Sequence, residues 1–186
     1  MAVLLSLLRN GKGTTWEGGM RVPALAWWPG TIPAGEVNQS LGTTMDLFST
    51  SLDVAGAEEP SDRIIDGTSL MPVFTGQQQS VRDMVFYYRE GKLFAVRKGP
   101  WKAHFITQSA YVGDKPVTHK RPQLYHLEKD PSEKYNLAKK HPEVLSEIQE
   151  AVQEHKKNLS RGDDQLAPVK KGRRFPGEIE YLFWEY

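Results

Sequence analysis

The sequence predicts two consecutive domains, the end of an α/β domain over residues 1–79 and a small α+β domain over residues 80–159. The first block contains a short continuous apolar run and then an amphipathic helix, a pattern typical of parallel sheets covered by helices. The second block contains short β-prone segments separated by turn residues, and then a long amphipathic helix. That pattern indicates an antiparallel sheet with a helix packed on it.

The apolar run of the first block is Ala24–Trp28, bounded by Pro23 and by Pro29-Gly30. Its length and continuity predict a strand buried on both faces of a parallel sheet. Because one strand does not make a sheet, its partner strands must come from elsewhere. Without them, the run would be exposed as an edge strand that invites aggregation.

A helix is predicted near Thr44–Ala55, after a loop over residues 31–40. Apolar side chains recur at helical spacing on one face, at Met45, Phe48, Leu52 and Ala55. Thr43 and Asp46 have the spacing of a capping box, and Gly56 is suited to end the helix.

The second block contains segments that predict an antiparallel meander with Glu90-Gly91 and Lys98-Gly99-Pro100 as turns. The predicted strands are Met84–Tyr88, Leu93–Arg97, Trp101–Ile106 and Gln123–Leu127. Thr107–Pro122 is expected to be a long polar loop.

A C-terminal helix is predicted from Pro142, at a position where proline is tolerated, to about Leu159. Its apolar face comprises Leu145, Ile148, Val152 and Leu159. Residues 160–186 include the basic run Lys170–Arg174 and are expected to form a disordered, solvated tail.

The composition excludes several kinds of protein. The chain has 186 residues, a formal net charge of +1 and no cysteine. The near-neutral charge argues against a nucleic-acid partner, and the lack of cysteine excludes disulfides, thiolate nucleophiles and zinc–thiolate sites. The apolar stretch over residues 2–8 is far shorter than the roughly 20 residues of a membrane span. It also lacks the basic start of a signal peptide, so the sequence predicts neither in this chain.

One motif carries the functional information. Residues 11–23 read Gly-Lys-Gly-Thr-Thr-Trp-Glu-Gly-Gly-Met-Arg-Val-Pro. Lys12 lies between two glycines, where the backbone can approach an anion closely and an ammonium can point at it. The hydroxyls of Thr14 and Thr15 are expected to tie the loop down, and Glu17 with Arg21 to form a supporting ion pair.

A nucleotide-binding phosphate loop does not fit the same residues. That motif needs serine or threonine directly after Gly-Lys and a glycine five residues earlier. The chain has Gly13 and Ser6 at those positions, so the pattern fails at both ends.

The motif resembles the second signature of the sulfatases, Gly-Lys-x-Thr-x-x-Glu-Gly-Gly-x-Arg. The resemblance is to the arylsulfatase A and N-acetylgalactosamine-6-sulfatase group, and it covers about Leu7 to Leu159. It implies that the chain is the C-terminal portion of such a protein and that Lys12 binds the sulfate group of the substrate. It also implies a large α/β domain of the alkaline-phosphatase type, followed by a smaller domain with a four-stranded antiparallel sheet and a C-terminal helix.

The resemblance makes His104 the second candidate for a catalytic and substrate-binding residue. Phe94–Arg97 and Lys102–Phe105 resemble a stretch of arylsulfatase A in which the matching histidine lies close to the substrate pocket. A histidine can bind an anionic oxygen or move a proton near neutral pH. It can equally be a strand residue packed between the two blocks, and the sequence leaves both open. The segment Lys129–Leu137 resembles another sulfatase string, whose Asp-Pro turn we interpret as structural.

The resemblance further implies a sulfuric ester hydrolase of the arylsulfatase type, acting on sulfated sugars or sulfolipids with calcium or another divalent cation. The family's nucleophile is a formylglycine made from Cys or Ser in a Cys/Ser-x-Pro/Ala-x-Arg motif, and this chain contains no such string. The metal-binding Asp-Asn pair of the family lies upstream of the lysine motif. We therefore expect a C-terminal fragment that is inactive alone. The alternative is a non-catalytic binding or assembly module derived from a truncated sulfatase.

By the same resemblance, the protein is expected to be lysosomal or secreted and to be a glycoprotein. Two Asn-x-Ser sequons, at Asn38 and Asn158, fit a secretory-pathway protein. The expected partner is a sulfated small molecule or glycan. Within that class the resemblance indicates a sulfated amino sugar as the substrate, because two segments are similar to the galactosamine-sulfatase branch, Pro23–Asp46 and Pro60–Arg63. The sequence leaves open whether the protein forms a homo-oligomer.

Overall fold

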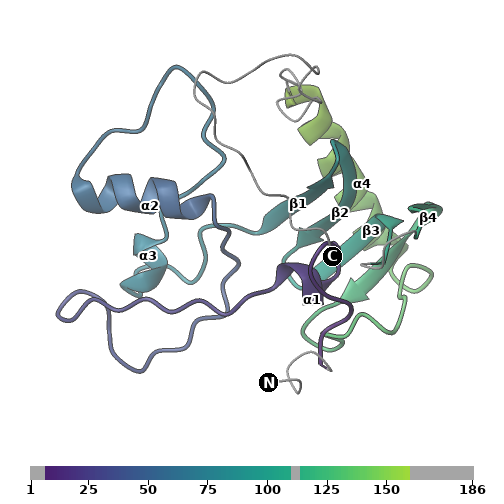
Figure 1. Cartoon of the computed structure of the whole chain (residues 1–186), viewed down its shortest axis with the longest axis horizontal. Coiled ribbons are helices and arrows are strands. Elements are labelled where there is room, and N and C mark those ends of the chain that lie inside the picture. The colour runs from purple at the N-terminus through teal and green to yellow at the C-terminus, as the bar shows by residue number, and fades with distance from the viewer. Residues whose placement is uncertain (1–6, 110–113, 160–186) are drawn as a thin grey trace, which may run out of the picture.

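The structure is a computed structural model that describes residues 7–109 and 114–159. Its elements are α1 (Glu17–Met20), α2 (Asp46–Ala55), α3 (Met71–Phe74), β1 (Met84–Arg89), β2 (Lys92–Lys98), β3 (Trp101–Thr107), β4 (Val117–His126) and α4 (Pro142–Asn158). Helices α2 and α3 lie together on one side, whereas the sheet and α4 lie on the other, with the α1 segment beside the sheet (Figure 1).

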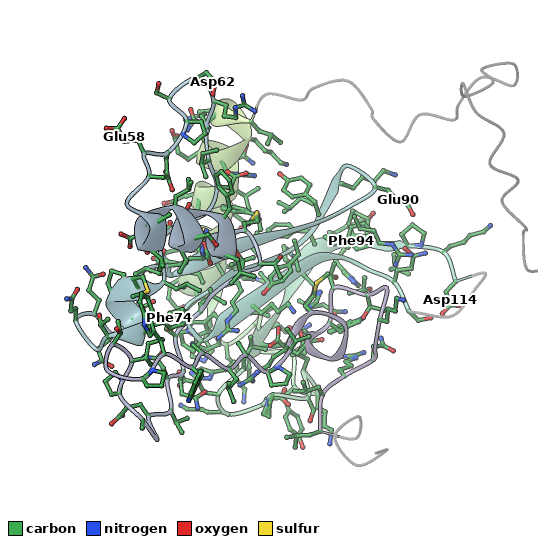
Figure 2. All side chains as sticks on the ribbon, turned by 60° about the vertical axis from the view of Figure 1, so that its left-hand side comes forward. Glu58, Asp62, Phe74, Glu90, Phe94 and Asp114 are labelled. Carbon is green, nitrogen blue, oxygen red and sulfur yellow. The ribbon has the colours of Figure 1, made fainter. Side chains whose placement is uncertain are left out.

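The sheet has four antiparallel strands in the order β1-β2-β3-β4, which confirms the predicted meander. The β1–β2 hairpin closes over Glu90 and Gly91, whose φ angles are 50° and 72°. Two consecutive residues with positive φ form the tight turn that matches the twist of paired strands. Figure 2 labels Glu90 at this turn and Phe94 on the following strand.

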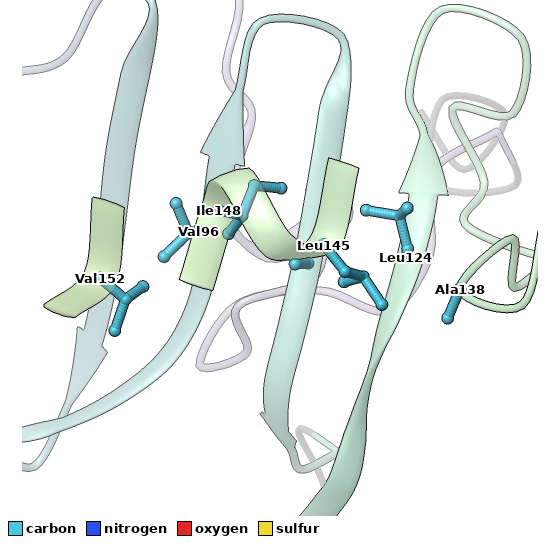
Figure 3. Packing of buried hydrophobic residues seen from close by; sticks show 7 residues of the cluster. Val96, Leu124, Ala138, Leu145, Ile148 and Val152 are labelled. Atoms are coloured by element: carbon cyan, nitrogen blue, oxygen red, sulfur yellow. The ribbon is translucent and has the colours of Figure 1, made fainter. Parts of the chain in front are cut away.

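One face of the sheet packs against α4 and forms the apolar core. Val96 pairs with Ala103, and Ala103 with Leu124, so these side chains lie in a row across three strands. Leu145, Ile148 and Val152 of α4 cover that row, and all six side chains are buried (Figure 3). Burial of a large aliphatic side chain stabilises a fold by about 1.5–3 kcal/mol, so this contact holds the second block together.

The opposite face of the same sheet is polar and yet equally buried. Lys102 and His104 flank Ala103 on β3, so strand alternation points them away from α4. Both have a relative exposure of 0%. The segment around α1 covers this face, and that contact positions the candidate site.

The predicted strand at Ala24–Trp28 is not formed. These residues are irregular and exposed, with Leu25 at 91% and Trp27 at 80%. A strand requires a neighbour for its backbone hydrogen bonds, and the described part of the chain pairs none with this segment. The expected exposure of the apolar run is therefore observed, although without strand geometry.

Helix α2 forms where predicted, and Gly56 ends it in the left-handed conformation with φ of 63°. The apolar face of α2 is not its buried face, however. The buried residues of α2 are Asp46, Ser49 and Thr50, whereas Met45 and Phe48 are 46% and 48% exposed. Periodicity identifies an apolar face but does not supply the surface that covers it. The loop that follows α2 carries Glu58 and Asp62 at its outer part (Figure 2).

Asp46 is the buried centre of the polar face of α2. Its Oδ2 accepts a hydrogen bond from Thr43 N at 2.7 Å, which is one half of the predicted capping box, and its Oδ1 accepts one from Thr68 N at 2.9 Å. The other half is not formed, because Asp46 N donates to the Thr43 backbone carbonyl and Thr43 Oγ1 donates to Asp46 Oδ2. The guanidinium of Arg82 pairs with the same carboxylate. Burial opposes ionisation, but the hydrogen bonds from Arg82, Thr43 and Thr68 together lower the pKa of Asp46.

Two further boundaries differ from expectation. Strand β4 begins at Val117, because Thr107 pairs with Val117 and Ile106 with Thr118, so part of the predicted polar loop belongs to the sheet. Such a polar edge strand lacks the apolar signal used to identify strands. Leu159 lies beyond the end of α4 and is 50% exposed rather than part of the buried helix face. The expected tail over 160–186 lies outside the described residues.

Candidate functional site

The loop that carries Lys12 has a defined backbone with an exposed lysine at its surface. Asn10 and Gly13, on either side of Lys12, have φ angles of 58° and 87°. Thr14 donates both its backbone N–H, at 3.2 Å, and its hydroxyl, at 2.9 Å, to the Gly11 carbonyl. These bonds close the loop tightly around Lys12. Thr14 is 1% exposed and Thr15 is 3% exposed.

The glycines of the motif let α1 pack directly on this loop. A Cβ added at Gly18 would lie 2.2 Å from the Asn10 carbonyl oxygen, and one at Gly19 would lie 2.4 Å from the Thr14 carbonyl oxygen. Both distances are far inside van der Waals contact. The Glu-Gly-Gly sequence therefore permits a backbone approach that no side chain would allow.

Glu17 forms an ion pair, but not the one expected. Its Oε1 lies 2.7 Å from Lys102 Nζ, and its Oε2 lies 3.9 Å from an Nη atom of Arg97. Arg21, the predicted partner, is exposed. The reason is geometric, since α1 turns Glu17 toward the polar face of the sheet, whereas Arg21 follows the helix into the exposed segment.

The polar face holds a cluster that we call the buried charge cluster, formed by the charged side chains of Glu17, Lys102 and Glu133 and by the ring of His104. Lys102 Nζ lies 2.7 Å from Glu17 and 3.8 Å from Glu133 Oε1, and it sits over the ring of Tyr87 at 4.6 Å from the centroid. All four members have an exposure of 2% or less. Buried charges are tolerated only when they are paired, and Lys102 compensates both carboxylates.

His104 is packed between the two blocks of the chain. Its ring lies 4.1 Å from the ring of Trp16, and its Nε2 lies 2.7 Å from Glu133 Oε1. Burial lowers the pKa of His104, with the ammonium of Lys102 acting in the same direction against the hydrogen bond to Glu133. The neutral ring therefore donates Nε2–H to Glu133. Its buried Nδ1 has no hydrogen-bond partner among the described residues.

This geometry fits the packing alternative for His104 that the sequence left open. A place for His104 in the substrate pocket stays a prediction. The Nε2–H of His104 is already used in its hydrogen bond to Glu133 Oε1.

The sequence did not single out three residues that belong to this cluster or contact Trp16, namely Arg9, Lys102 and Glu133. The guanidinium of Arg9 stacks 3.8 Å above the Trp16 ring. Lys102 lies two residues before His104, so strand alternation alone could have placed both on one face. Glu133 lies in the Asp-Pro turn, and no local sequence pattern indicates that its side chain is buried.

The described ranges contain no group of three or more His, Asp and Glu side chains that could hold a metal ion. The described residues therefore do not by themselves provide a site for the divalent cation that the resemblance implies. In the same ranges, no helix is long and apolar enough to cross a membrane.

Family models match both blocks of the chain. The model for the C-terminal region of aryl-sulfatase matches residues 80–176, and the sulfatase model matches residues 5–57. The two matched ranges fall on either side of the predicted domain boundary near residue 79. That boundary itself stays a prediction.

Individual proteins give the same result. The chain is 43% identical over 179 residues to N-acetylgalactosamine-6-sulfatase of Canis lupus familiaris, covering 84% of this chain and 34% of that protein. It is 42% identical over 164 residues to arylsulfatase A of Bos taurus, covering 80% and 32%. The crystal structure of PsFucS1 sulfatase from Pseudoalteromonas sp. matches with a TM-score of 0.74 and 29% identity, covering 80% of this chain and 32% of that one. The chain thus spans about a third of the length of the relatives it matches.

Proposed function

This chain belongs to the sulfatase family, and we propose that it supplies the sulfate-binding lysine and the C-terminal domain of a sulfuric ester hydrolase. In this proposal Lys12 binds the sulfate group of the substrate. The observation that carries it is the placement of Lys12 as an exposed cation on a loop closed by Thr14 and packed on α1.

The chemistry explains why such a lysine would be useful. A sulfate ester has an anionic head, and its cleavage builds further negative charge. An ammonium held in place before the reaction stabilises that charge without the reorganisation that water would require. A mobile loop would have to be ordered in each catalytic cycle, so the hydrogen bonds that close the backbone around Lys12 support the proposal.

For the substrate, we propose the class of sulfated sugars, with a sulfated amino sugar first. The name of the relative at 43% identity, N-acetylgalactosamine-6-sulfatase, supports this class. The sequence likeness of Pro23–Asp46 to that branch points the same way. These residues lie outside the sheet domain, in the segment that precedes and enters α2.

We further propose that the nucleophile and the calcium or other divalent cation belong to parts of a longer protein that this chain does not contain. The chain has no cysteine to become formylglycine, and it spans about a third of its relatives. His104 has in this proposal a packing role beside Trp16, and the 186-residue chain alone has no turnover.

A lysosomal or secreted, glycosylated protein is also proposed. Asn38 and Asn158, the acceptors of the two sequons, are both exposed. A loss of mass on enzymatic removal of N-glycans from the protein of its natural source would check this, and an unchanged mass would contradict it.

The test of function joins this chain to the preceding two thirds of the canine N-acetylgalactosamine-6-sulfatase and measures cleavage of a fluorogenic aryl sulfate with calcium present. Loss of one oxyanion-stabilising group costs about 10²–10³ in kcat. We expect Lys12→Ala to lower kcat/KM by at least about 10² on that basis. The matched control is Lys139→Ala, because Lys139 is an exposed lysine of the second block.

Equal activity of the Lys12→Ala protein and the parent would overturn the role of Lys12. Turnover by the 186-residue chain alone, abolished by Lys12→Ala, would show that the nucleophile lies within the chain. The non-catalytic binding module would be favoured by two results together. The fusion would never turn over, and the soluble 186-residue chain would bind inorganic sulfate.

A further inference from the structure

We propose that Glu133 is the positioning residue for Lys12, holding both ends of the loop that carries it. This inference rests on the proposed function of Lys12 in binding sulfate. Glu133 does not need to touch the substrate, because it acts through the backbone of residues 9–17. Glu133 belongs to the Asp-Pro turn of the second predicted domain, whereas Lys12 belongs to the first. The second domain would therefore set the position of the sulfate-binding lysine of the first.

Both flanks of the lysine loop attach to the turn that contains Glu133. Before Lys12, Arg9 donates from Nη1 to the backbone carbonyl oxygen of Glu133 at 2.7 Å. After Lys12, the backbone N–H of Glu17, the first residue of α1, donates to Glu133 Oε2 at 2.8 Å. A further bond runs from Ser132 Oγ to the Leu7 carbonyl at 2.5 Å. The loop is therefore held at its entry and its exit by one turn.

The two oxygens of the Glu133 carboxylate have different partners. Oε2 holds the loop through Glu17 N, whereas Oε1 holds the sheet through His104 Nε2 at 2.7 Å and faces Lys102 Nζ at 3.8 Å. A carboxylate is suited to this because it accepts on both oxygens. An amide in its place has only one accepting oxygen. Glutamine would therefore turn its N–H₂ either to the Glu17 N–H, which is a donor, or to His104, whose ring would have to move its proton to Nδ1 to accept it.

The backbone at Glu133 is held in a costly conformation. Its φ is 51°, in the left-handed region that glycine favours, and its side chain is fully buried. Such a conformation persists only when the surroundings over-determine it, and it is often found where positioning matters. Here the Asp130 carbonyl accepts from Glu133 N at 3.0 Å, and Asp130 Oδ2 accepts from Tyr135 N at 2.8 Å, which fixes the turn.

The proposal predicts local loosening when Glu133 loses its charge. Native-state amide hydrogen exchange by NMR on the 186-residue chain compares Glu133→Gln with the parent and with Glu128→Gln, an exposed glutamate of the same region. We expect the amides of Thr14 and Gly18 to exchange about tenfold faster or more in Glu133→Gln only. Amides of the central strand β2 should keep their rates.

Arg9→Met provides a second variant in case Glu133→Gln does not fold, because Arg9 is exposed and outside the buried charge cluster. Its loss removes the entry tether to Glu133, while the apolar methionine side chain can still pack on the Trp16 ring that the guanidinium covers. It should also accelerate exchange at Thr14 and Gly18. Unchanged exchange at these amides in a folded variant would overturn the proposal. So would equal acceleration at β2, which would indicate general destabilisation instead of a local positioning role.

A kinetic cycle in the aryl sulfate assay then tests whether Glu133 acts through Lys12. We expect Glu133→Gln to lower kcat about tenfold or more in the parent fusion and to have little effect in the Lys12→Ala fusion. Equal losses in both backgrounds would show that Glu133 acts independently, which overturns the inference. Faster exchange in Glu133→Gln, together with a Lys12→Ala fusion as active as the parent, would instead refute only the proposed role of Lys12.

Discussion

Replacement of Lys102 by methionine would test whether the buried charge cluster depends on a single cation. Methionine keeps the length and apolar stem of lysine and removes only the ammonium. The two carboxylates of Glu17 and Glu133 would then share one buried face without the charge that lies 2.7 Å from the first and 3.8 Å from the second. Arg97, at 3.9 Å from Glu17, would be the remaining cation in the ion pairs of this cluster.

The magnitude follows from the distances. With an effective dielectric constant near 20, a charge pair at 2.7 Å is worth about 6 kcal/mol and one at 3.8 Å about 4 kcal/mol. The desolvation of Lys102 itself offsets much of that sum. Removing one partner of a buried pair costs about 3–5 kcal/mol, because the other charge stays buried without compensation. We expect Lys102→Met to lower the free energy of unfolding by this amount.

Urea denaturation followed by tryptophan fluorescence and circular dichroism measures the change. Lys139→Met is the control and should change the free energy of unfolding by less than about 0.5 kcal/mol. The double variant Lys102→Met with Glu17→Gln should recover part of the loss, because it removes an unpaired carboxylate along with the cation. A loss below about 1 kcal/mol for Lys102→Met, or no recovery in the double variant, would refute the reasoning.

Two other predictions concern ionisation. Asp46→Asn should cost about 1.5–3 kcal/mol at pH 7, the usual range for a hydrogen bond to a charged group. The pKa of Asp46 is lowered below 3.8 in the fold, so its contribution is present above pH 3.8 and is lost as pH falls through the folded value. Urea denaturation should show the variant and parent converging at acid pH, and a constant difference would contradict this. The pKa of His104 is lowered below 6.5, so its ring should be neutral and carry its proton on Nε2 at pH 6.5. Long-range ¹H–¹⁵N correlation spectra report both, and a charged ring or an Nδ1–H tautomer would contradict the assignment.

Local sequence patterns determined the elements whose signals lie within a few residues. The alternation and turn residues of residues 84–107 predicted three strands and their hairpins, and Glu90-Gly91 predicted the first turn. The face of α4 that carries Leu145, Ile148 and Val152 followed from helical periodicity. The residues and spacing of the lysine motif alone indicated the family. In each case the information is short-range, because dihedral preferences and periodicity act between neighbours.

Tertiary structure decided where charged groups went and which apolar faces were covered. Glu17 and Lys102 are 85 residues apart, and Glu17 and Glu133 are 116 apart, so no local pattern could pair them. The same holds for α2 and Ala24–Trp28, whose apolar residues are mostly exposed although their patterns are typical of buried faces. The sequence determines which side chains favour burial or pairing, but the partner comes from the whole fold. Since burial and ion pairing are properties of two surfaces, only their juxtaposition decides them.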